Sequence, residues 1–390
     1  MKKITCKDER DRRRIIMVNI KAPETYVNEP GSIRTAGSLI SVFGTKALVI
    51  GGEQALMAVG EAFTKSLEES QITFQTEVFQ GYPTIEKAKL YAVLAQKDGI
   101  EVIVAVGGGK VCDVSKAAAD FAGLPVITVP TVLATCAAWA SVSVIYTEEG
   151  DFQTFHPNRF TPRVILADPE ILIKAPERYL KAGIVDTYAK WYELAPGLKG
   201  REDTLPMQLS SYGAKLAFDI LDDHYEQAID AVRKGKVNDS FVQVIDSVIF
   251  LAGYVGTFVG ARAYSGFAHP FYHSSRRIAA SRKSLHGELV AYGILAQLVL
   301  EKKPEEEIAE VIRKFAQFDE AFTLEDLGLE DVTLEAEELK AKKEEGLKII
   351  AQRTLDEFGG FTKLGFGYTV EEIYEGLTKA DELVRKYKRK

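Results

Sequence analysis

The chain has 390 residues, of which 46% are hydrophobic and 27% charged, a composition typical of a folded globular protein. Its net charge of −7 argues against nucleic acid or an acidic membrane surface as a partner, because both are negatively charged. A chain of this length is expected to form two domains.

The N-terminal segment, Met1 to Arg14, is rich in Lys, Arg, Asp and Glu. It has no apolar stretch, so it predicts a short extension and not a secretory signal. No apolar run comes near the roughly 20 residues that span a bilayer. Cys6, Cys112 and Cys136 are too few and too scattered for a disulfide framework or a C-x-x-C metal site. A cytoplasmic protein without a membrane or nucleic-acid partner is therefore expected.

Strand and helix signals alternate through the first half of the chain. Short β-branched runs that stop at Gly or Pro predict buried strands, and apolar residues spaced three or four apart predict helices. This alternation predicts a parallel sheet with helices on both faces. The predicted strands are Lys46–Ile50, Thr73–Phe79, Glu101–Val106, Leu124–Val129, Ser141–Tyr146 and Arg163–Ala167, and the predicted helices are Gln54–Leu67, Thr84–Gln96, with Thr84 as its cap, and Val114–Phe121.

A glycine turn, Gly107-Gly108-Gly109-Lys110, directly follows one of these strands. Asp113 is expected to cap the helix behind it. Strand, glycine turn and helix together aim free backbone N–H groups at a phosphate, and glycines let them approach closely because no Cβ intervenes. A single glycine turn is a weak signal, so a tight connection without a ligand stays as the alternative.

From about Lys174 onward strand signals almost vanish. The sequence therefore predicts an α/β dinucleotide-binding domain over 1–173 and a helical metal and substrate domain over 174–390, with the chemistry in the cleft between them. The segment Glu148–Pro162 is expected to be a loop. Helices are predicted over Tyr179–Glu193, Leu205–Asp222, Glu226–Lys234, Asp239–Tyr254 and His286–Leu300.

Three of the five histidines, His269, His273 and His286, fall within eighteen residues. Asp186 is an acid inside an otherwise apolar helical stretch, and a buried carboxylate needs a partner or a metal. Two imidazoles and one carboxylate would make an open three-ligand metal site. Ordinary helix histidines and a capping aspartate are the alternative. His156 and His224 lie in polar surroundings, where solvated side chains are expected.

Taken together, these motifs resemble the glycerol dehydrogenase branch of the iron-containing, group III alcohol dehydrogenases. The resemblance runs from about Tyr26 to the C-terminus. It is carried by the glycine turn, Asp113, Lys116, Val129-Pro130-Thr131, Ser141–Tyr146, Lys174-Ala175-Pro176, Asp186, His269, His273 and His286-Gly287-Glu288.

The resemblance implies the fold, the cofactors and several site residues. The fold would be dehydroquinate synthase-like, an α/β domain followed by an all-α domain. One divalent metal, zinc or iron, would be held by Asp186, His269 and His286, and His273 would be the candidate proton relay. NADP(H) or NAD(H) would bind at Gly52, Gly107, Gly108, Gly109, Lys110, Thr131, Val142 and Tyr146.

The segment Thr135-Cys136-Ala137-Ala138-Trp139 departs from glycerol dehydrogenases, which carry an aspartate at the position of Cys136. It is similar to the hydroxycarboxylate dehydrogenase subgroup, whose members reduce small 2-oxo acids. An aspartate there would repel a carboxylate, cysteine removes that charge, and Trp139 would narrow the pocket. A nucleophilic role for Cys136 is disfavoured, because no histidine is close in sequence.

The sequence thus predicts a metal- and nicotinamide-dependent oxidoreductase that interconverts a 2-oxo acid and its 2-hydroxy acid, as a homo-oligomer. Among Arg276, Arg277, Arg282 and Lys283, one is a candidate to face a substrate carboxylate. Two alternatives stay open: a glycerol or polyol dehydrogenase, and a degenerate member that binds nucleotide without catalysis. Val185 and Pro270, which depart from the family pattern beside two ligands, support the latter.

Cofactor choice depends on Gly52, which follows the first predicted strand where glycerol dehydrogenases have aspartate. Glycine neither binds the ribose 2′-OH nor repels a 2′-phosphate, so NADP(H) is expected to be accepted. Glu53 is the alternative ribose contact.

Overall fold

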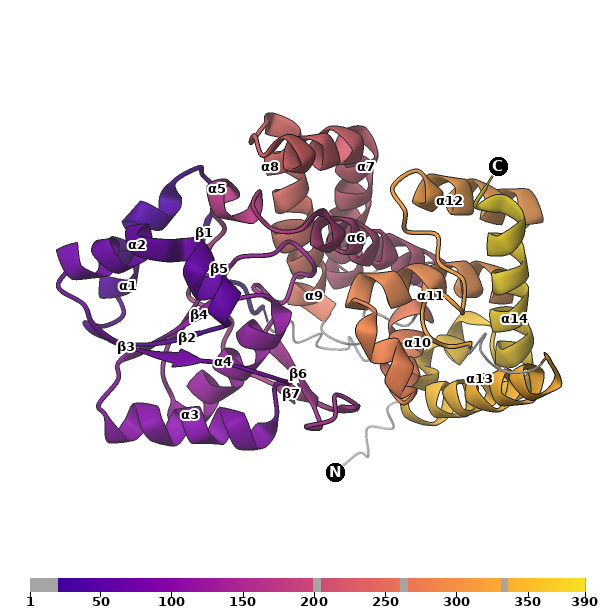
Figure 1. Cartoon of the computed structure of the whole chain (residues 1–390), viewed down its shortest axis with the longest axis horizontal. Coiled ribbons are helices and arrows are strands. Elements are labelled where there is room, and N and C mark those ends of the chain that lie inside the picture. Colours follow the sequence, from indigo (N-terminus) through magenta and orange to yellow (C-terminus); the bar gives the residue numbers. More distant parts are fainter. Residues whose placement is uncertain (1–19, 199–204, 260–265, 331–335, 390) are drawn as a thin grey trace, which may run out of the picture.

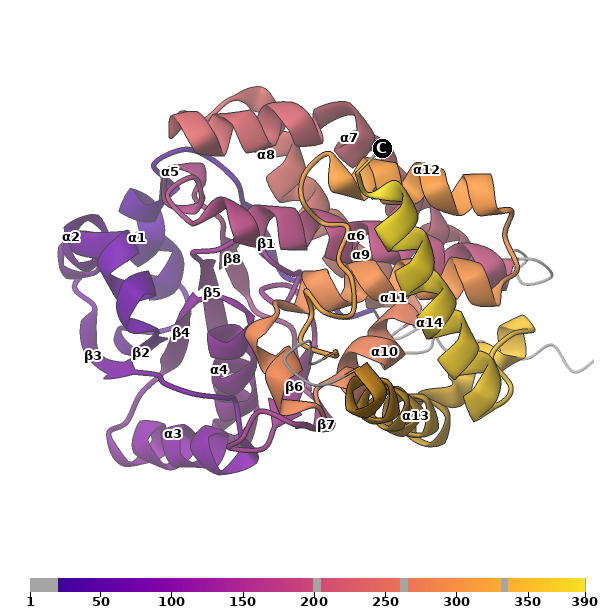
Figure 2. The same ribbon diagram turned by 45° about the vertical axis from the view of Figure 1, so that its right-hand side comes forward.

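The computed structural model of the chain describes residues 20–198, 205–259, 266–330 and 336–389. The predicted extension Met1–Arg14, including Cys6, lies outside these residues. Within them, a sheet flanked by helices occupies one side of the molecule, in indigo to purple, and the later helices occupy the other (Figures 1 and 2). An α/β part followed by a helical part confirms the predicted fold class.

The main sheet has six strands in the order β1-β8-β5-β4-β2-β3, and every adjacent pair is parallel. Five of the six strands were predicted, and β1 was missed because three residues give no periodic signal. The strands are β1 Thr25–Val27, β2 Lys46–Gly51, β3 Thr73–Val78, β4 Val102–Gly107, β5 Val126–Pro130 and β8 Val164–Leu166.

Alternate residues of the central strands face opposite sides of the sheet, and both sides are apolar because helices cover both. Ala47 and Val49 pack with α1 and α2 on one face, whereas Leu48 and Ile50 pack with α3 and α4 on the other. These helices are α1 Ala36–Ser41, preceded by the 3-10 turn η1 Ser32–Thr35, and α2 Glu53–Glu69, α3 Ile85–Lys97 and α4 Gly109–Ala122. The Thr84 side chain caps α3 as predicted, accepting from the Lys87 N–H at 3.2 Å.

Parallel strands end at one common edge, and this edge forms one wall of the site. Gly52 follows β2 there, the glycine turn follows β4, and Thr131 follows β5. The predicted cap Asp113 is wrong: α4 begins at Gly109 with Gly108 as its cap, and Asp113 lies inside the helix in an ion pair with Lys116, 3.0 Å away.

The predicted loop Glu148–Pro162 is also wrong in part. It contains β7 (Phe152–Pro157), which pairs with β6 (Val142–Tyr146) as an antiparallel hairpin separate from the main sheet. Most β7 side chains are exposed, so the strand lacks the apolar alternation that would reveal it.

Helices form the remainder of the described chain. The two predicted segments on either side of residue 224 are one helix, and the segment beginning at Asp239 continues through a π-helical turn. The elements are α5 Pro169–Leu172, α6 Glu177–Leu198, α7 Leu205–Lys234, α8 Asp239–Ile245, η2 Asp246–Leu251, α9 Ala252–Val259, α10 Ala268–Ser275, η4 Ala279–Lys283, α11 His286–Leu300, α12 Glu305–Ala316, α13 Ala336–Phe358, η5 Gly359–Leu364 and α14 Val370–Tyr387.

Glycines allow three of these helices to approach one another closely. A Cβ on Gly293 of α11 would lie 2.7 Å from the Cα of Ala268 in α10, and a Cβ on Gly287 would overlap the backbone of Ala182 in α6. No larger residue fits without moving a helix, so the glycines fix how closely α6, α10 and α11 approach.

One described segment, Asp239–Phe258, is long and apolar enough to cross a membrane, with a mean hydropathy of 1.6. The expectation that no segment has this character is therefore wrong. The segment packs against α7, and 56% of its apolar 18-residue window is buried inside the molecule, as in the core helix of a helical domain.

Candidate active site

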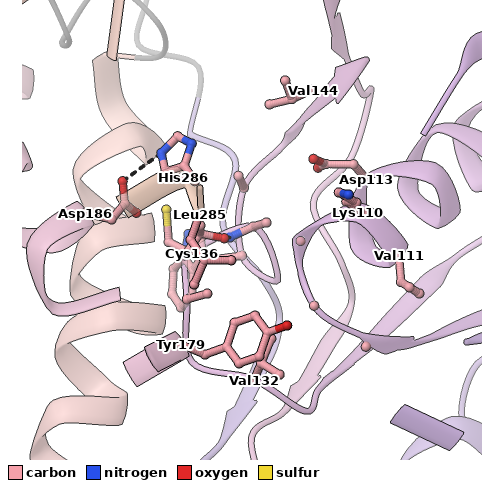
Figure 3. Close-up of a pocket in the computed structure, with 18 of the residues that line it drawn as sticks. Lys110, Val111, Asp113, Val132, Cys136, Val144, Tyr179, Asp186, Leu285 and His286 are labelled. Carbon is pink, nitrogen blue, oxygen red and sulfur yellow. Dashed lines mark hydrogen bonds and ion pairs between the residues drawn. The ribbon is translucent and has the colours of Figure 1, made fainter. Parts of the chain in front are cut away.

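A cavity of about 1330 Å³ lies between the carboxyl edge of the sheet and the helical part. Figure 3 shows Asp186, His286 and Cys136 on one side of it, and Lys110, Val111 and Asp113 of α4 on the other. Its size exceeds the ordinary range for a single small ligand. Every residue predicted for the site lines this cavity.

The glycine turn forms a cradle at the start of α4. A Cβ on Gly108 would lie 2.8 Å from Val132 Cγ2, and one on Gly107 would lie 2.8 Å from Val111 Cγ2. The 14-residue helix presents its free N–H groups and its positive dipole end at this point. These features fit the pyrophosphate of a dinucleotide.

The other predicted cofactor residues extend from this cradle along the cavity wall. Gly52 caps α2 and has no atom within 4 Å of where its Cβ would be. Thr131 donates its backbone N–H to Gly107 O at 3.4 Å. Val142 and Tyr146 come from β6, and the hydroxyl oxygens of Tyr146 and Tyr272 lie 2.8 Å apart. Together with Lys110, these residues form an elongated wall that suits an extended ligand.

Asp186, His269 and His286 converge on one point from three helices. Their candidate ligand atoms all lie within 4.8 Å of one another. Asp186 Oδ1 is 3.2 Å from His269 Nε2 and 3.0 Å from His286 Nε2. One carboxylate oxygen and two imidazole nitrogens facing a cavity are the donor set of a catalytic site for zinc or ferrous iron, with a position left for substrate.

Glu193, seven residues after Asp186 on the same face of α6, orients His269. Its carboxylate contacts His269 Nδ1 and accepts the His269 backbone N–H at 2.9 Å. With Nδ1–H donating to Glu193, the Nε2 lone pair of His269 points toward Asp186, the arrangement that metal-bound histidines adopt. Burial is the largest influence on His269 and opposes its protonation, but the charge of Glu193 and the hydrogen bonds to Asp186 and Glu193 together raise the pKa of His269.

The electrostatics of the other two donors favour their ligand forms. Burial acts against ionisation of Asp186, yet the neighbouring Lys190 and His286 hold its pKa well below the ordinary value. Burial lowers the pKa of His286 despite the nearby Asp186. An ionised carboxylate and a neutral imidazole are the forms that bind metal.

Lys190 is a site residue that the sequence reasoning did not assign. Its Nζ lies 3.2 Å from Asp186 Oδ1 and 3.1 Å from His269 Nε2, and its side chain is 5% exposed. The Lys190 ammonium therefore contacts two of the three donor atoms that a metal would use. Spacing could have revealed it, because Asp186, Lys190 and Glu193 fall at i, i+4 and i+7 on one face of an apolar helix.

Pro270 and Val185 do not distort the site. Pro270 is the third residue of α10, within the first turn, where the backbone N–H has no intrahelical partner to lose. Val185 is fully buried in the core of the helical part, beside Asp186.

His273 lines the cavity but makes no hydrogen bond through Nδ1. Its ring packs against Phe152, Phe155 and Phe358, with centroids 4.6 to 5.4 Å apart. Burial and the nearby His286 and His269 place the pKa of His273 well below its ordinary value. The imidazole is neutral at pH 7, so it can accept a proton at one nitrogen as it releases one at the other.

Cys136 and Trp139, the two residues expected to shape the substrate pocket, both line the cavity. Burial raises the pKa of the Cys136 thiol, which keeps it protonated and argues against a nucleophile. Trp139 packs against Gly253, donates Nε1–H to Thr257 Oγ1 at 3.2 Å, and is 4% exposed. It is a fixed wall of the cavity.

Buried Lys116 holds this segment in place. Its ammonium donates to the carbonyl oxygens of Ala137, Ala140 and Val142 at 2.7 to 3.0 Å. The Asp113–Lys116 pair therefore ties α4 to the segment that carries Cys136 and Trp139.

Outside the cavity, the expected solvated state of His156 is wrong. Its Nε2 lies 3.1 Å from Asp120 Oδ2, and its side chain is 18% exposed. His224 is half-buried, with Nδ1 3.0 Å from Ser240 Oγ.

Comparison with known proteins identifies the family. Residues 23–169 match the family described as iron-containing alcohol dehydrogenase. Hydroxycarboxylate dehydrogenase A of Escherichia coli (strain K12) is 32% identical over 295 residues, which are 72% of this chain and 77% of that protein. The chain belongs to the iron-containing alcohol dehydrogenase family. It is therefore an oxidoreductase-family member, and the family implies a nicotinamide cofactor and a metal ion.

Two further relatives place the chain in the glycerol dehydrogenase-like branch of the iron-containing alcohol dehydrogenases. The crystal structure of glycerol dehydrogenase from Schizosaccharomyces pombe superposes with a TM-score of 0.83 at 26% identity, covering 95% of this chain and 92% of that one. Glycolaldehyde reductase of Halobacterium salinarum is 28% identical over 94% of this chain and 98% of its own length. The activities for which these relatives are named differ, so they leave the substrate open.

Proposed function

We propose that this iron-containing alcohol dehydrogenase interconverts a small 2-oxo acid and its 2-hydroxy acid, using NADP(H) or NAD(H) and one divalent metal. The charge of the cavity wall carries the proposal, because positive walls attract anions. Among described residues the wall holds seven cations, Lys21, Lys110, Lys174, Lys190, Arg276, Arg282 and Lys283, and three acids, Glu53, Asp113 and Asp186. Two of these three acids are already ion-paired, Asp113 with Lys116 and Asp186 with Lys190.

In this proposal, different residues of the cavity bind the cofactor, bind the metal and shape the substrate end. The glycine turn and α4 hold the pyrophosphate, and Asp186, His269 and His286 hold the metal. When bound, the metal acts as a Lewis acid on the substrate oxygen, and the reduced nicotinamide supplies the hydride. Trp139 and the neutral thiol of Cys136 shape the substrate end without adding negative charge.

Neutral His273 accepts and releases the proton that the substrate oxygen exchanges, the relay role predicted from the sequence. The position of the His273 side chain in the cavity wall supports this role.

A second candidate is reduction of a neutral hydroxyaldehyde or oxidation of a polyol. It is favoured by the glycolaldehyde reductase, which matches 94% of this chain, whereas the hydroxycarboxylate dehydrogenase matches 72%. The uncharged Cys136, where an acid would bind polyol hydroxyls, favours the oxo acid.

A substrate panel tests the choice. Pyruvate, 2-oxobutyrate, glycolaldehyde and glycerol are assayed with NADH/NAD⁺ and NADPH/NADP⁺, after chelation and after adding Zn²⁺ or Fe²⁺. We expect the highest kcat/KM with an oxo acid, and Cys136→Asp should lower that value while sparing glycolaldehyde. Preference for glycolaldehyde or glycerol by the wild type would overturn the oxo-acid proposal. Full activity in chelator, with no metal by mass spectrometry, would overturn the metal.

We further propose a cytoplasmic homo-oligomer. The free thiols of Cys112 and Cys136 support a reducing compartment. The edge strand β3 and the 66%-exposed Leu90 on α3 support association. Light scattering after size exclusion tests the oligomer, and cell fractionation tests the location.

A further inference from the structure

Arg276, at the end of α10, is a buried cation without an anionic partner. It is 4% exposed and lines the cavity. Its Nη2 donates to Tyr82 Oη at 3.2 Å, its Nη1 makes a long contact of 3.5 Å with Ser281 O, and its Nε has no partner. No acid of the described chain lies within ion-pair distance of this guanidinium. Burying a charge without a counter-charge is costly, so the position calls for an anion from outside the chain.

Lys110 faces Arg276 from the other wall of the cavity. It is the last residue of the glycine turn and the second residue of α4, and its Nζ lies 3.9 Å from the centroid of the Tyr82 ring. The Arg276 guanidinium carbon lies 5.9 Å from the same centroid. Within the described residues, Lys110 also has no carboxylate partner. The Tyr82 ring thus lies near two positive charges, that of Lys110 from the α/β part and that of Arg276 from the helical part.

This pair lies on the cavity wall that leads from the glycine turn to the metal triad. From Tyr82, the wall continues through Tyr146, with ring centroids 5.8 Å apart, to Tyr272, whose hydroxyl meets that of Tyr146. The Tyr272 ring then lies 4.1 Å from that of His286. An anion at Arg276 is consequently within reach of a ligand that binds at the turn or at the metal.

We propose that Arg276 and Lys110, across Tyr82, form an oxyanion subsite of the cavity. Its ligand is an oxyanion borne by a cavity ligand, either the carboxylate of the substrate or a phosphate of the dinucleotide. A planar guanidinium carries several N–H donors for such a group, and the Tyr82 hydroxyl and the Lys110 ammonium add further donors. The carboxylate source rests on the proposed oxo-acid substrate, whereas the phosphate source is independent of that choice.

Isothermal titration calorimetry tests the subsite. Wild type, Arg276→Gln and Arg276→Lys are titrated with NADH, and their complexes with NAD⁺ are titrated with 2-oxobutyrate and with neutral glycolaldehyde. We expect Arg276→Gln to weaken 2-oxobutyrate or NADH by roughly 10- to 100-fold, the range for losing one charge-assisted interaction. Arg276→Lys should lose less because it keeps the charge. A loss confined to 2-oxobutyrate identifies the carboxylate, and a loss for NADH identifies the phosphate.

Arg277→Gln is the matched control. This neighbour is 62% exposed and pairs with Asp151, so its loss should leave all three dissociation constants within about twofold. Wild-type affinities in Arg276→Gln, or an equal loss for glycolaldehyde, would overturn the subsite. If the wild type binds no 2-oxobutyrate, the proposed substrate is wrong. In that case the NADH titration alone tests the subsite, and an unchanged NADH affinity in Arg276→Gln would overturn it.

Discussion

Gly293→Ala tests whether the glycine contacts between helices build the metal site. The added Cβ would lie 2.7 Å from the Cα of Ala268, whereas ordinary contact begins near 3.4 Å, so α10 and α11 must separate by roughly 0.7 Å. Overpacking of this kind costs about 1–3 kcal/mol of unfolding free energy. His269 follows Ala268 directly, and metal–ligand distances tolerate only about 0.2 Å. We therefore expect metal affinity to fall by roughly 10- to 100-fold, as for loss of a supporting contact.

The assay is competition for Zn²⁺ with a chromophoric chelator, alongside urea unfolding. Gly346→Ala on α13 is the control, because its Cβ would meet only Ile278 Cδ1 at 3.9 Å. A mid-helix Gly-to-Ala change without a clash should raise stability by about 0.5–1 kcal/mol and leave metal affinity alone. Wild-type zinc affinity in folded Gly293→Ala would refute the reasoning that close helix packing positions the ligands.

Three further predictions concern the cofactor and the effect of pH. Gly109→Val should weaken NAD(P)H binding at least tenfold in a fluorescence titration. Its Tm should change little, because a Cβ at this position meets only Thr135 and Ala137 at 3.4–3.5 Å. Unchanged affinity would make the turn purely structural. Gly52→Asp, at an open position, should shift the kcat/KM ratio toward NAD(H), and strict NAD(H) use by the wild type would contradict this. Burial and the nearby Glu288 raise the pKa of Glu320 from 4.5 to about 9, so wild-type stability should fall as the pH rises between these values. Glu320→Gln should remove that slope and gain about 3 kcal/mol at pH 7 in urea unfolding, and identical pH profiles would count against the buried acid.

The sequence was informative where the signal is local. The strand Val102–Gly107 is an uninterrupted buried apolar run, and its boundary was right to within one residue. The start of α4 was missed because a glycine gives weak helix propensity, although free N–H groups at that glycine are what a phosphate site needs. The strand β7 was missed because only its pairing with β6 holds it.

In the candidate site, too, local signals could be predicted and the effects of packing could not. Asp186 stood out as an acid in an apolar helix, and the histidines stood out by their clustering. Their convergence to within 4.8 Å depends on how α6, α10 and α11 pack, which no local pattern encodes. Arg276 was one of four neighbouring cations in the sequence, and only burial separates it from the exposed Arg277.

The pairing of β1 with β8 sets an order on the synthesis and folding of this chain. Thr25 pairs with Val164, so β1 must wait until β8 has left the ribosome, on the order of ten seconds at ordinary translation rates. Strands β2 to β5 are mutual neighbours and can assemble earlier. Tyr26 and Asn28 then bond to Asp246, at 2.9 and 2.7 Å, which emerges later still. The first strand made is therefore among the last to be secured, and an N-terminal truncation past Asn28 would remove a late folding step while leaving the early four-strand sheet intact.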